Sequence, residues 1–264
     1  MPPDADAVVL HLPHDSTVIP DDLRPTLLPD DVALHQELMA MTDHHTVDLF
    51  SGVENARTVV FPVSRLVVDP ERFLDDASEP MAQRGMGVIY TTCSTGAPLR
   101  HPPTAAERAV LLARYYHPHH ARLTSAVSEA LDLHAYCLIL DCHSFPAQSP
   151  AHELYHVDVR PDICLGTDAY HTPTWLTDAA REAFESKGHR VAIDAPYTGT
   201  IVPLAHLGSE PRVLSLMIEV NRGLYVNETT GMRLETFARH RSAIARAVRR
   251  ITAVVADHIS LEHG

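Results

Sequence analysis

Short runs of apolar and β-branched residues recur along the chain, and each has the length of a buried strand rather than of a helix. The first run, Val8–Leu12, ends at Pro13, which cannot donate a hydrogen bond to a neighbouring strand. We expect strands at Val8–Leu12, Thr58–Val63, Leu66–Val68, Ala135–Leu140, Ile163–Leu165, Val191–Ile193 and Val213–Val220.

Longer segments between these runs have helical character. Thr104 followed by Glu107 is the pattern of a capping box, so a helix is expected to begin there, with a kink or break at Pro118. The segments 74–103 and 144–161 are expected to be long irregular loops. We expect helices at Asp30–Ser51, Thr104–Leu133, Pro173–Ser186 and Thr230–Ile259.

Strands thus alternate with helices along the chain, which indicates an α/β fold with a mainly parallel sheet. Strands that are apolar on both faces, such as Val213–Val220, are typical of a sheet covered by helices on both sides. We take residues 1–264 as a single α/β domain. In such folds active sites lie at the carboxyl ends of the strands, so polar residues near those ends are the first candidates for chemistry.

The composition of the chain argues against several classes of binding partner. The chain has 264 residues and a formal net charge of −13, which argues against nucleic acid and anionic membranes as partners. Its apolar runs are too short for a membrane span, and its first ten residues lack the basic start of a secretory signal. Four cysteines without C-x-x-C spacing indicate reduced, mostly buried thiols. We expect a cytoplasmic protein that acts on a small molecule, in an oligomeric state that the sequence leaves open.

Histidine is unusually frequent, with 19 residues. His14 and His143 each follow an apolar run, and Glu219 lies near the end of a third. Catalytic zinc takes three nitrogen, oxygen or sulfur ligands and keeps one position for water, whose proton a neighbouring carboxylate can accept. The pattern indicates a metal site with Glu219 as the acid/base. The third ligand stays open among Asp43, His44 and His45.

Other candidates surround this set. Arg65 and Arg72 lie in or next to predicted strands, and arginine binds carboxylates in a bidentate way, so the pair favours a small anionic substrate. His120 is a candidate for the substrate side of the site. His11 points to the opposite face of its strand from His14 and is expected to be structural. The chain has no G-x-S-x-G elbow, which disfavours a serine hydrolase.

Eight short strings occur in a fixed order along the chain. They are PHDS, TDHHTVDLF, SRLVVDPER, YYHPHH, DCHS, PDICLG, DAPYTGT and IEVNRGLY, and they lie within residues 8–228. Together they resemble the N-formylglutamate amidohydrolase family. The resemblance implies a zinc carboxypeptidase-like hydrolase with a three-layer α/β/α core and a mixed sheet. It also implies cleavage of the amide of an N-acylated acidic amino acid such as N-formyl-L-glutamate.

The resemblance further implies one zinc ion and a role for each matching position. His14, Asp43 and His143 would be the metal ligands, with Glu219 as the general base. Arg65 would serve as a catalytic residue that stabilises the oxyanion. The remaining positions taken as substrate-binding are Asp69, Arg72, Tyr197, Gly199, Asn221 and Arg222.

The chain departs from the family's pattern in two places. Ser16 stands where the family has glycine after its PHS or PHA string. The string Asp69-Pro70-Glu71-Arg72 stands where the family commonly has D-L-N-R, so an asparagine is lost and the acidic Glu71 is gained. This exchange changes the charge beside the expected carboxylate clamp.

The leading hypothesis is a zinc-dependent amidohydrolase that cleaves the amide of an N-formyl or N-acyl amino acid. One alternative is a carboxypeptidase-like hydrolase of a peptide or of a biosynthetic amide. The other is a non-catalytic metal-binding protein of the same fold, although such a protein would have no need of Glu219.

Overall fold

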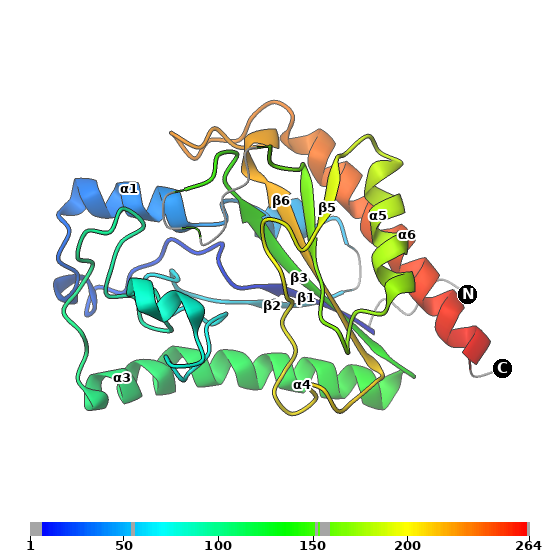
Figure 1. The fold of residues 1–264 in the computed structure, drawn as a ribbon, viewed down its shortest axis with the longest axis horizontal. Coiled ribbons are helices and arrows are strands. Elements are labelled where there is room, and N and C mark those ends of the chain that lie inside the picture. Colours follow the sequence, from blue (N-terminus) through cyan, green and yellow to red (C-terminus); the bar gives the residue numbers. More distant parts are fainter. Residues whose placement is uncertain (1–6, 54–55, 151–152, 154–158, 263–264) are drawn as a thin grey trace.

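A six-stranded sheet forms the centre of the computed structural model, which describes residues 7–53, 56–150, 153 and 159–262. The strand order is β2-β1-β3-β6-β4-β5 (Figure 1). The strands are β1 (Val8–Leu12), β2 (Arg57–Val60), β3 (Cys137–Phe145), β4 (Ile163–Gly166), β5 (Val191–Ile193) and β6 (Val213–Asn221). Neighbouring strands pair in parallel except β4 and β6, which pair antiparallel. The sheet is mixed and mainly parallel, which confirms the predicted α/β class.

Helices cover both faces of the sheet. They are α1 (Asp31–Met41), α2 (Thr46–Phe50), α3 (Ala105–Leu111), α4 (His117–Leu133), α5 (Thr174–Glu185) and α6 (Phe237–Glu262). Shorter helical segments lie at Arg24–Thr26, Pro80–Arg84, Leu112–Tyr116 and Arg222–Leu224. Figure 1 shows α4 along one side of the sheet, with α5 and α6 along the other. Separate apolar clusters fill the two sides, one against α2, α5 and α6 and one against α4.

The central strand β3 carries both core and site residues. Its side chains alternate, so that Leu140 joins the cluster against α5 and α6 while Ile139 joins the cluster against α4. Asp141 and His143 continue the α4 face. The prediction that this strand ends at Leu140 was wrong, because the strand continues to Phe145 and is buried throughout. Its polar side chains are tolerated in the sheet because partners on the α4 face satisfy them.

The single helix predicted over Asp30–Ser51 is in fact two helices. The segment 42–45 separates α1 from α2, and His45 there adopts a left-handed backbone with φ of 65°. The main-chain N–H of Asp43 donates to the carbonyl of His14 at 2.9 Å. This break therefore attaches Asp43 to the chain just beyond β1.

The strand predicted over Leu66–Val68 was wrong, because this segment is a turn. The N–H of Val67 donates to the carbonyl of Ser64 at 2.9 Å. Leu66 packs into one apolar cluster, whereas Val67 and Val68 pack into another. The apolar composition reflects burial in two directions rather than strand geometry. The strand predicted over Thr58–Val63 is present in shortened form as β2.

The helix predicted over Thr104–Leu133 is present, and its capping box between Thr104 and Glu107 is confirmed. It consists of α3, a π-helical segment at Leu112–Tyr116, and α4. Pro118 lies in the first turn of α4, directly after this segment. Because proline lacks the N–H that would bond to the preceding turn, a locally wider helix suits its position.

Three other observations complete the fold. The C-terminal helix begins at Phe237 rather than at Thr230, because Gly231 donates its N–H to the carbonyl of Asn227 at 2.8 Å and closes a turn. All four cysteines are buried and unpaired. None of the helices within the described residues has the length and apolar character that crossing a membrane requires.

Leu216 tests the contribution of the central sheet to stability, since it is fully buried on β6. We expect Leu216→Ala to lower the free energy of unfolding by about 2–5 kcal/mol, through lost apolar burial and the cavity left behind. Leu261, which is 83% exposed on α6, is the matched control, and Leu261→Ala should change stability by less than about 0.5 kcal/mol. Denaturant unfolding measures both, and equal losses would contradict the assignment of the core.

Candidate metal centre and active site

A cavity of about 650 Å³ lies where β1, β3 and β6 end. These strands are adjacent and parallel, so their carboxyl ends meet at one edge of the sheet. His14 follows β1, while His143 on β3 and Glu219 on β6 are partners in the strand register. All three side chains line the cavity. Residues predicted from separate strands therefore meet at one place.

Asp43 lies between the two histidines. Its Oδ2 is 3.2 Å from His143 Nδ1 and 3.7 Å from His14 Nδ1. The three residues are buried, and each offers one ligand atom within 4.8 Å of the other two. His44 and His45 instead bond to main-chain carbonyls. Of the candidates left open for the third ligand, Asp43 is the one that meets His14 and His143.

A buried carboxylate orients each histidine from behind. His14 Nε2 bonds to Asp69 Oδ1, and His143 Nε2 bonds to Asp141 Oδ1, both at 2.9 Å. The two Nδ1 atoms consequently face Asp43, and among the described residues His14 Nδ1 has no hydrogen-bond partner. A buried nitrogen of this kind is costly unless a ligand satisfies it. Carboxylate–histidine pairs commonly orient metal ligands, and two imidazoles with a carboxylate fit zinc.

The charges of the cluster favour a cation. Burial alone would raise the pKa of Asp43, but its contacts with His14 and His143 hold that pKa well below the usual value. Burial alone would lower the pKa of His143, but Asp141 raises that pKa well above the usual value. Burial also opposes the ionisation of Asp69, yet nearby positive charge, chiefly that of Arg65, lowers its pKa. The carboxylates therefore stay ionised and stabilise positive charge beside the two Nδ1 atoms.

Glu219 lies beside this cluster on β6, opposite His143 in the strand register. Its side chain is 7% exposed, and its Oε2 has no hydrogen-bond partner in the described part of the chain. Burial raises the pKa of Glu219 to about 8, against the lowering effect of the His143 charge. A carboxyl group with a pKa near neutrality can accept and return a proton, which is the property of a general base.

Arg65 and Arg72 converge on Asp69. Arg65 donates to Asp69 Oδ2 from Nε at 3.1 Å and from Nη2 at 2.7 Å, and its Nε also contacts the Tyr90 hydroxyl. Arg72 Nε lies 3.6 Å from the same carboxylate oxygen. Both guanidinium groups line the cavity, whereas Asp69 is fully buried behind its wall. Asp69 therefore orients His14 and the arginines, and it does not reach the substrate surface expected for it.

Arg222, Tyr197 and Gly199 line the cavity as predicted. Arg222 donates from Nη1 to a main-chain carbonyl at 3.1 Å, and its Nε has no hydrogen-bond partner among the residues described. Asn221 lies outside the cavity wall. Its side chain donates to one main-chain carbonyl and accepts one main-chain N–H, so it shapes the turn after β6 rather than the pocket.

The two remaining histidine candidates have separate roles. His120 lines the cavity, and burial lowers its pKa to about 4, so its ring is neutral near pH 7. His11 forms a second group of possible ligands with Glu71 and Asp141. However, its Nδ1 bonds to Asp141 at 2.8 Å and its Nε2 bonds to His119 at 2.7 Å. With both nitrogens engaged, His11 is a structural residue, as expected.

Three contributors were missed by the sequence analysis. Asp141 precedes His143 by two positions, and residues two apart on a strand share a face, so the DCHS string did contain this signal. Glu71 was noted only as a departure from a pattern, and it proves to line the cavity. The buried hydroxyl of Tyr90 donates to Asp69, and no feature of the sequence marks this long-range contact.

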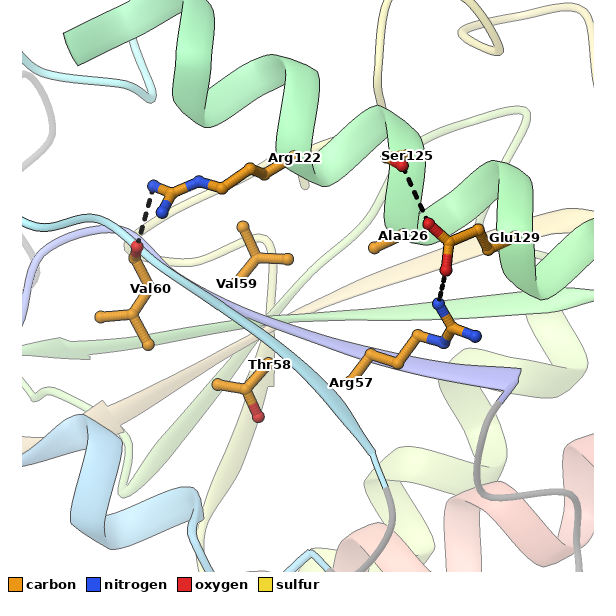
Figure 2. Close-up of a pocket in the computed structure, with 8 residues that line it drawn as sticks. All are labelled: Arg57, Thr58, Val59, Val60, Arg122, Ser125, Ala126 and Glu129. Atoms are coloured by element: carbon orange, nitrogen blue, oxygen red, sulfur yellow. Dashed lines mark hydrogen bonds and ion pairs between the residues drawn. The ribbon is translucent and has the colours of Figure 1, made fainter.

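Figure 2 shows another, smaller cavity of about 340 Å³ between β2 and α4. Arg57 pairs there with Glu129, which also accepts a hydrogen bond from Ser125, and Arg122 donates to the carbonyl of Val60. All three of its charged side chains have hydrogen-bond partners, so the described lining of this cavity differs from that of the first, where buried polar atoms have none.

Comparison with known proteins identifies the family. The family model for N-formylglutamate amidohydrolase matches residues 6–226. The chain belongs to the N-formylglutamate amidohydrolase family. The crystal structure of N-formylglutamate amidohydrolase from Ralstonia eutropha JMP134 is 27% identical, with a TM-score of 0.81 over 94% of each chain.

A second solved structure supports the fold alone. This gene product of Agrobacterium tumefaciens is 22% identical, with a TM-score of 0.64 over 97% of the present chain and 94% of its own. The search of curated proteins gives no match. The family resemblance expected from the eight strings is therefore confirmed by the family model and by a solved structure of the family.

The raised pKa of Glu219 gives a test of its environment in the metal-free protein. The side chain ionises near pH 4.5 in the unfolded chain but near pH 8 in the folded one, so the folded state binds more protons between these values. The free energy of unfolding should therefore fall as pH rises through this window. Glu219→Gln cannot ionise, so it lacks this loss. The free energy of unfolding of the variant, minus that of wild type, should therefore rise across this pH window by on the order of a few kcal/mol in total. Unfolding at several pH values with a chelator present measures the difference, and a constant difference would contradict the burial of an ionisable Glu219.

Proposed function

We propose that the protein is a zinc-dependent amidohydrolase that cleaves the amide of an N-formyl or N-acyl amino acid, such as N-formyl-L-glutamate. One observation carries the proposal. His14, Asp43 and His143 bring their ligand atoms together, and Glu219 lies beside them. Among the described residues, His14 Nδ1 and Glu219 Oε2 have no hydrogen-bond partner. Membership of the N-formylglutamate amidohydrolase family supports the same chemistry.

His14, Asp43 and His143 would hold the metal ion. A bound zinc ion would polarise the acyl carbonyl and lower the pKa of water, which makes water a nucleophile near neutral pH. Glu219 accepts the proton of the attacking water on its carboxylate and returns that proton to the departing amine nitrogen. Its burial keeps this carboxylate out of bulk water, and its elevated pKa matches both transfers.

Arg65 and Arg222 would stabilise different parts of the substrate. Arg65 uses Nε and Nη2 for Asp69 and Tyr90, which leaves Nη1 to stabilise the developing oxyanion. Arg222 has no carboxylate bonded to it within the described residues and lies next to β6, close in sequence to Glu219. It is therefore the group that suits the α-carboxylate of the substrate.

One observation favours the carboxypeptidase-like alternative. Four of the exposed large apolar side chains line the cavity: Phe73, Leu74, Leu204 and Leu207. An apolar rim of this kind suits a substrate that is longer than a formyl amino acid. A substrate panel that contains both N-formyl amino acids and short peptides separates the two functions.

Metal content and hydrolysis test the proposal together. We expect about one zinc per wild-type chain, loss of the metal in His143→Ala, and retention of the metal in Glu219→Gln. Because Glu219 moves the proton, Glu219→Gln should lower kcat by at least about 100-fold. Elemental analysis and release of formate or amino acid measure these values.

Each outcome of that experiment bears on a separate part of the proposal. A wild-type protein that binds no zinc when zinc is supplied would overturn the metal mechanism. A Glu219→Gln variant with full activity would overturn the base assignment. Zinc bound without hydrolysis of any amide in the panel would favour the non-catalytic alternative.

Asp141 provides a test that does not depend on activity. It does not join the His14, Asp43 and His143 group, but it orients His143 through Nε2. We expect Asp141→Asn to weaken zinc binding by about 10- to 100-fold. Competition with a coloured chelator measures the affinity, and Glu182→Gln, a change in an exposed ion pair on α5, is the control. Unchanged affinity would show that the orientation of His143 does not matter.

A further inference from the structure

Glu71 is an acidic residue of the cavity that the proposed mechanism leaves unused. Among the described residues, seven acidic side chains line the cavity. Hydrogen bonds from described protein groups satisfy five of them, namely Asp43, Glu79, Asp141, Glu153 and Asp168. The other two are Glu219 and Glu71, and the buried Oε1 of Glu71 has no hydrogen-bond partner among the described residues. A carboxylate that is held in a cavity wall without a protein donor is available to a ligand.

The neighbouring His11 does not neutralise Glu71. Its Nδ1 lies 2.8 Å from Asp141 and 3.2 Å from Glu71 Oε1, so the shorter contact takes its N–H. His11 is fully buried, and this burial lowers its pKa, so the ring carries a single proton. His119 then donates to the other ring nitrogen, which explains their 2.7 Å contact. His11 therefore has no N–H left to donate to Glu71.

Carboxylates offset the charge of both arginines of this wall, although Arg72 Nε has no hydrogen-bond partner among the described residues. Arg65 is bonded to Asp69, and Arg72 lies 3.6 Å from Asp69 and 3.8 Å from Glu79. With Glu71 included, this wall has two guanidinium groups and three carboxyl groups. It therefore lacks the excess of positive charge that would attract a second substrate carboxylate.

Glu219 and Glu71 lie on opposite sides of His143. Glu219 is on β6, whereas Glu71 contacts His11 on β1, and β3 with His143 runs between these strands. A substrate with its scissile amide at the histidines and its α-carboxylate at Arg222 would be held on the β6 side. Its side chain can then extend toward Glu71.

We propose that Glu71 sets the side-chain specificity of the site, so that N-formyl amino acids ending in a carboxamide are preferred over those ending in a carboxylate. This inference rests on the proposed function and names the substrate class of the same site. A carboxamide both donates and accepts hydrogen bonds, so it pairs with a carboxyl group in either protonation state. A substrate carboxylate would be repelled by ionised Glu71 and could accept only one hydrogen bond from the protonated form.

N-formyl-L-glutamine and N-formyl-L-glutamate test the inference because they have nearly the same shape. We expect wild-type kcat/KM to be at least about tenfold higher for the glutamine substrate. Glu71→Gln keeps the size of the side chain but cannot ionise, so it should shift this ratio at least about tenfold toward the glutamate substrate. Glu71→Asn is a second variant in case the first is unstable, and Glu182→Gln on α5 should leave the ratio unchanged.

Binding provides a readout that is independent of turnover. Calorimetry of both ligands with zinc-loaded Glu219→Gln, with and without Glu71→Gln, should give Kd ratios in the same direction as the kinetic ratios. If neither compound is hydrolysed, the proposed function fails, and these Kd ratios still decide the role of Glu71. A preference for glutamate in the presence of Glu71, or a ratio that Glu71→Gln does not change, would overturn the inference.

Discussion

The geometry of the site depends on one buried carboxylate, that of Asp141. It accepts hydrogen bonds from His11 and His143 at Oδ1 and from the main-chain N–H of Ile201 at Oδ2. An ionised carboxylate in the interior is tolerated only when such donors replace water. Their positions are therefore coupled, because rotation of the His143 ring would remove one of the hydrogen bonds that satisfy Asp141. This constraint aims His143 Nδ1 at Asp43 and attaches the loop containing Ile201 to the cavity.

Asp69 plays the same part on the other side of the cluster. It holds His14 Nε2 while it accepts hydrogen bonds from Arg65 and Tyr90. Asp43 lies between the two oriented rings, so three carboxylates surround two imidazoles. His14, Asp43 and His143 are the residues that would hold a divalent cation, which would balance this charge. Asp69 and Asp141 stabilise the fold, and they also orient the two histidines.

The sequence predicted which residues meet in the cavity better than it predicted the ends of the strands that carry them. His14, His143 and Glu219 could be found because each lies near the end of an apolar run, where parallel strands expose side chains. The strand ends themselves were misjudged, since Asp141 looks like the start of a loop until its partners are known. Asp69 was expected to bind substrate, although contacts with residues 14, 65 and 90 bury it behind the cavity wall. Such long-range contacts leave no local periodicity, so no pattern along the chain could have revealed them.

Glu219 and Glu71 have the same side chain and line the same cavity, but their surroundings act differently on their pKa values. Burial is the largest cause of a raised pKa for both. For Glu219 the next cause is the charge of His143, which favours ionisation and brings the pKa into the range of proton transfer. For Glu71 the next cause is the like charge of Asp141, which raises the pKa further and opposes ionisation. A group that resists ionisation is a poor base but a good hydrogen-bonding partner. This difference supports the proposed division, with proton transfer at Glu219 and recognition of a neutral polar group at Glu71.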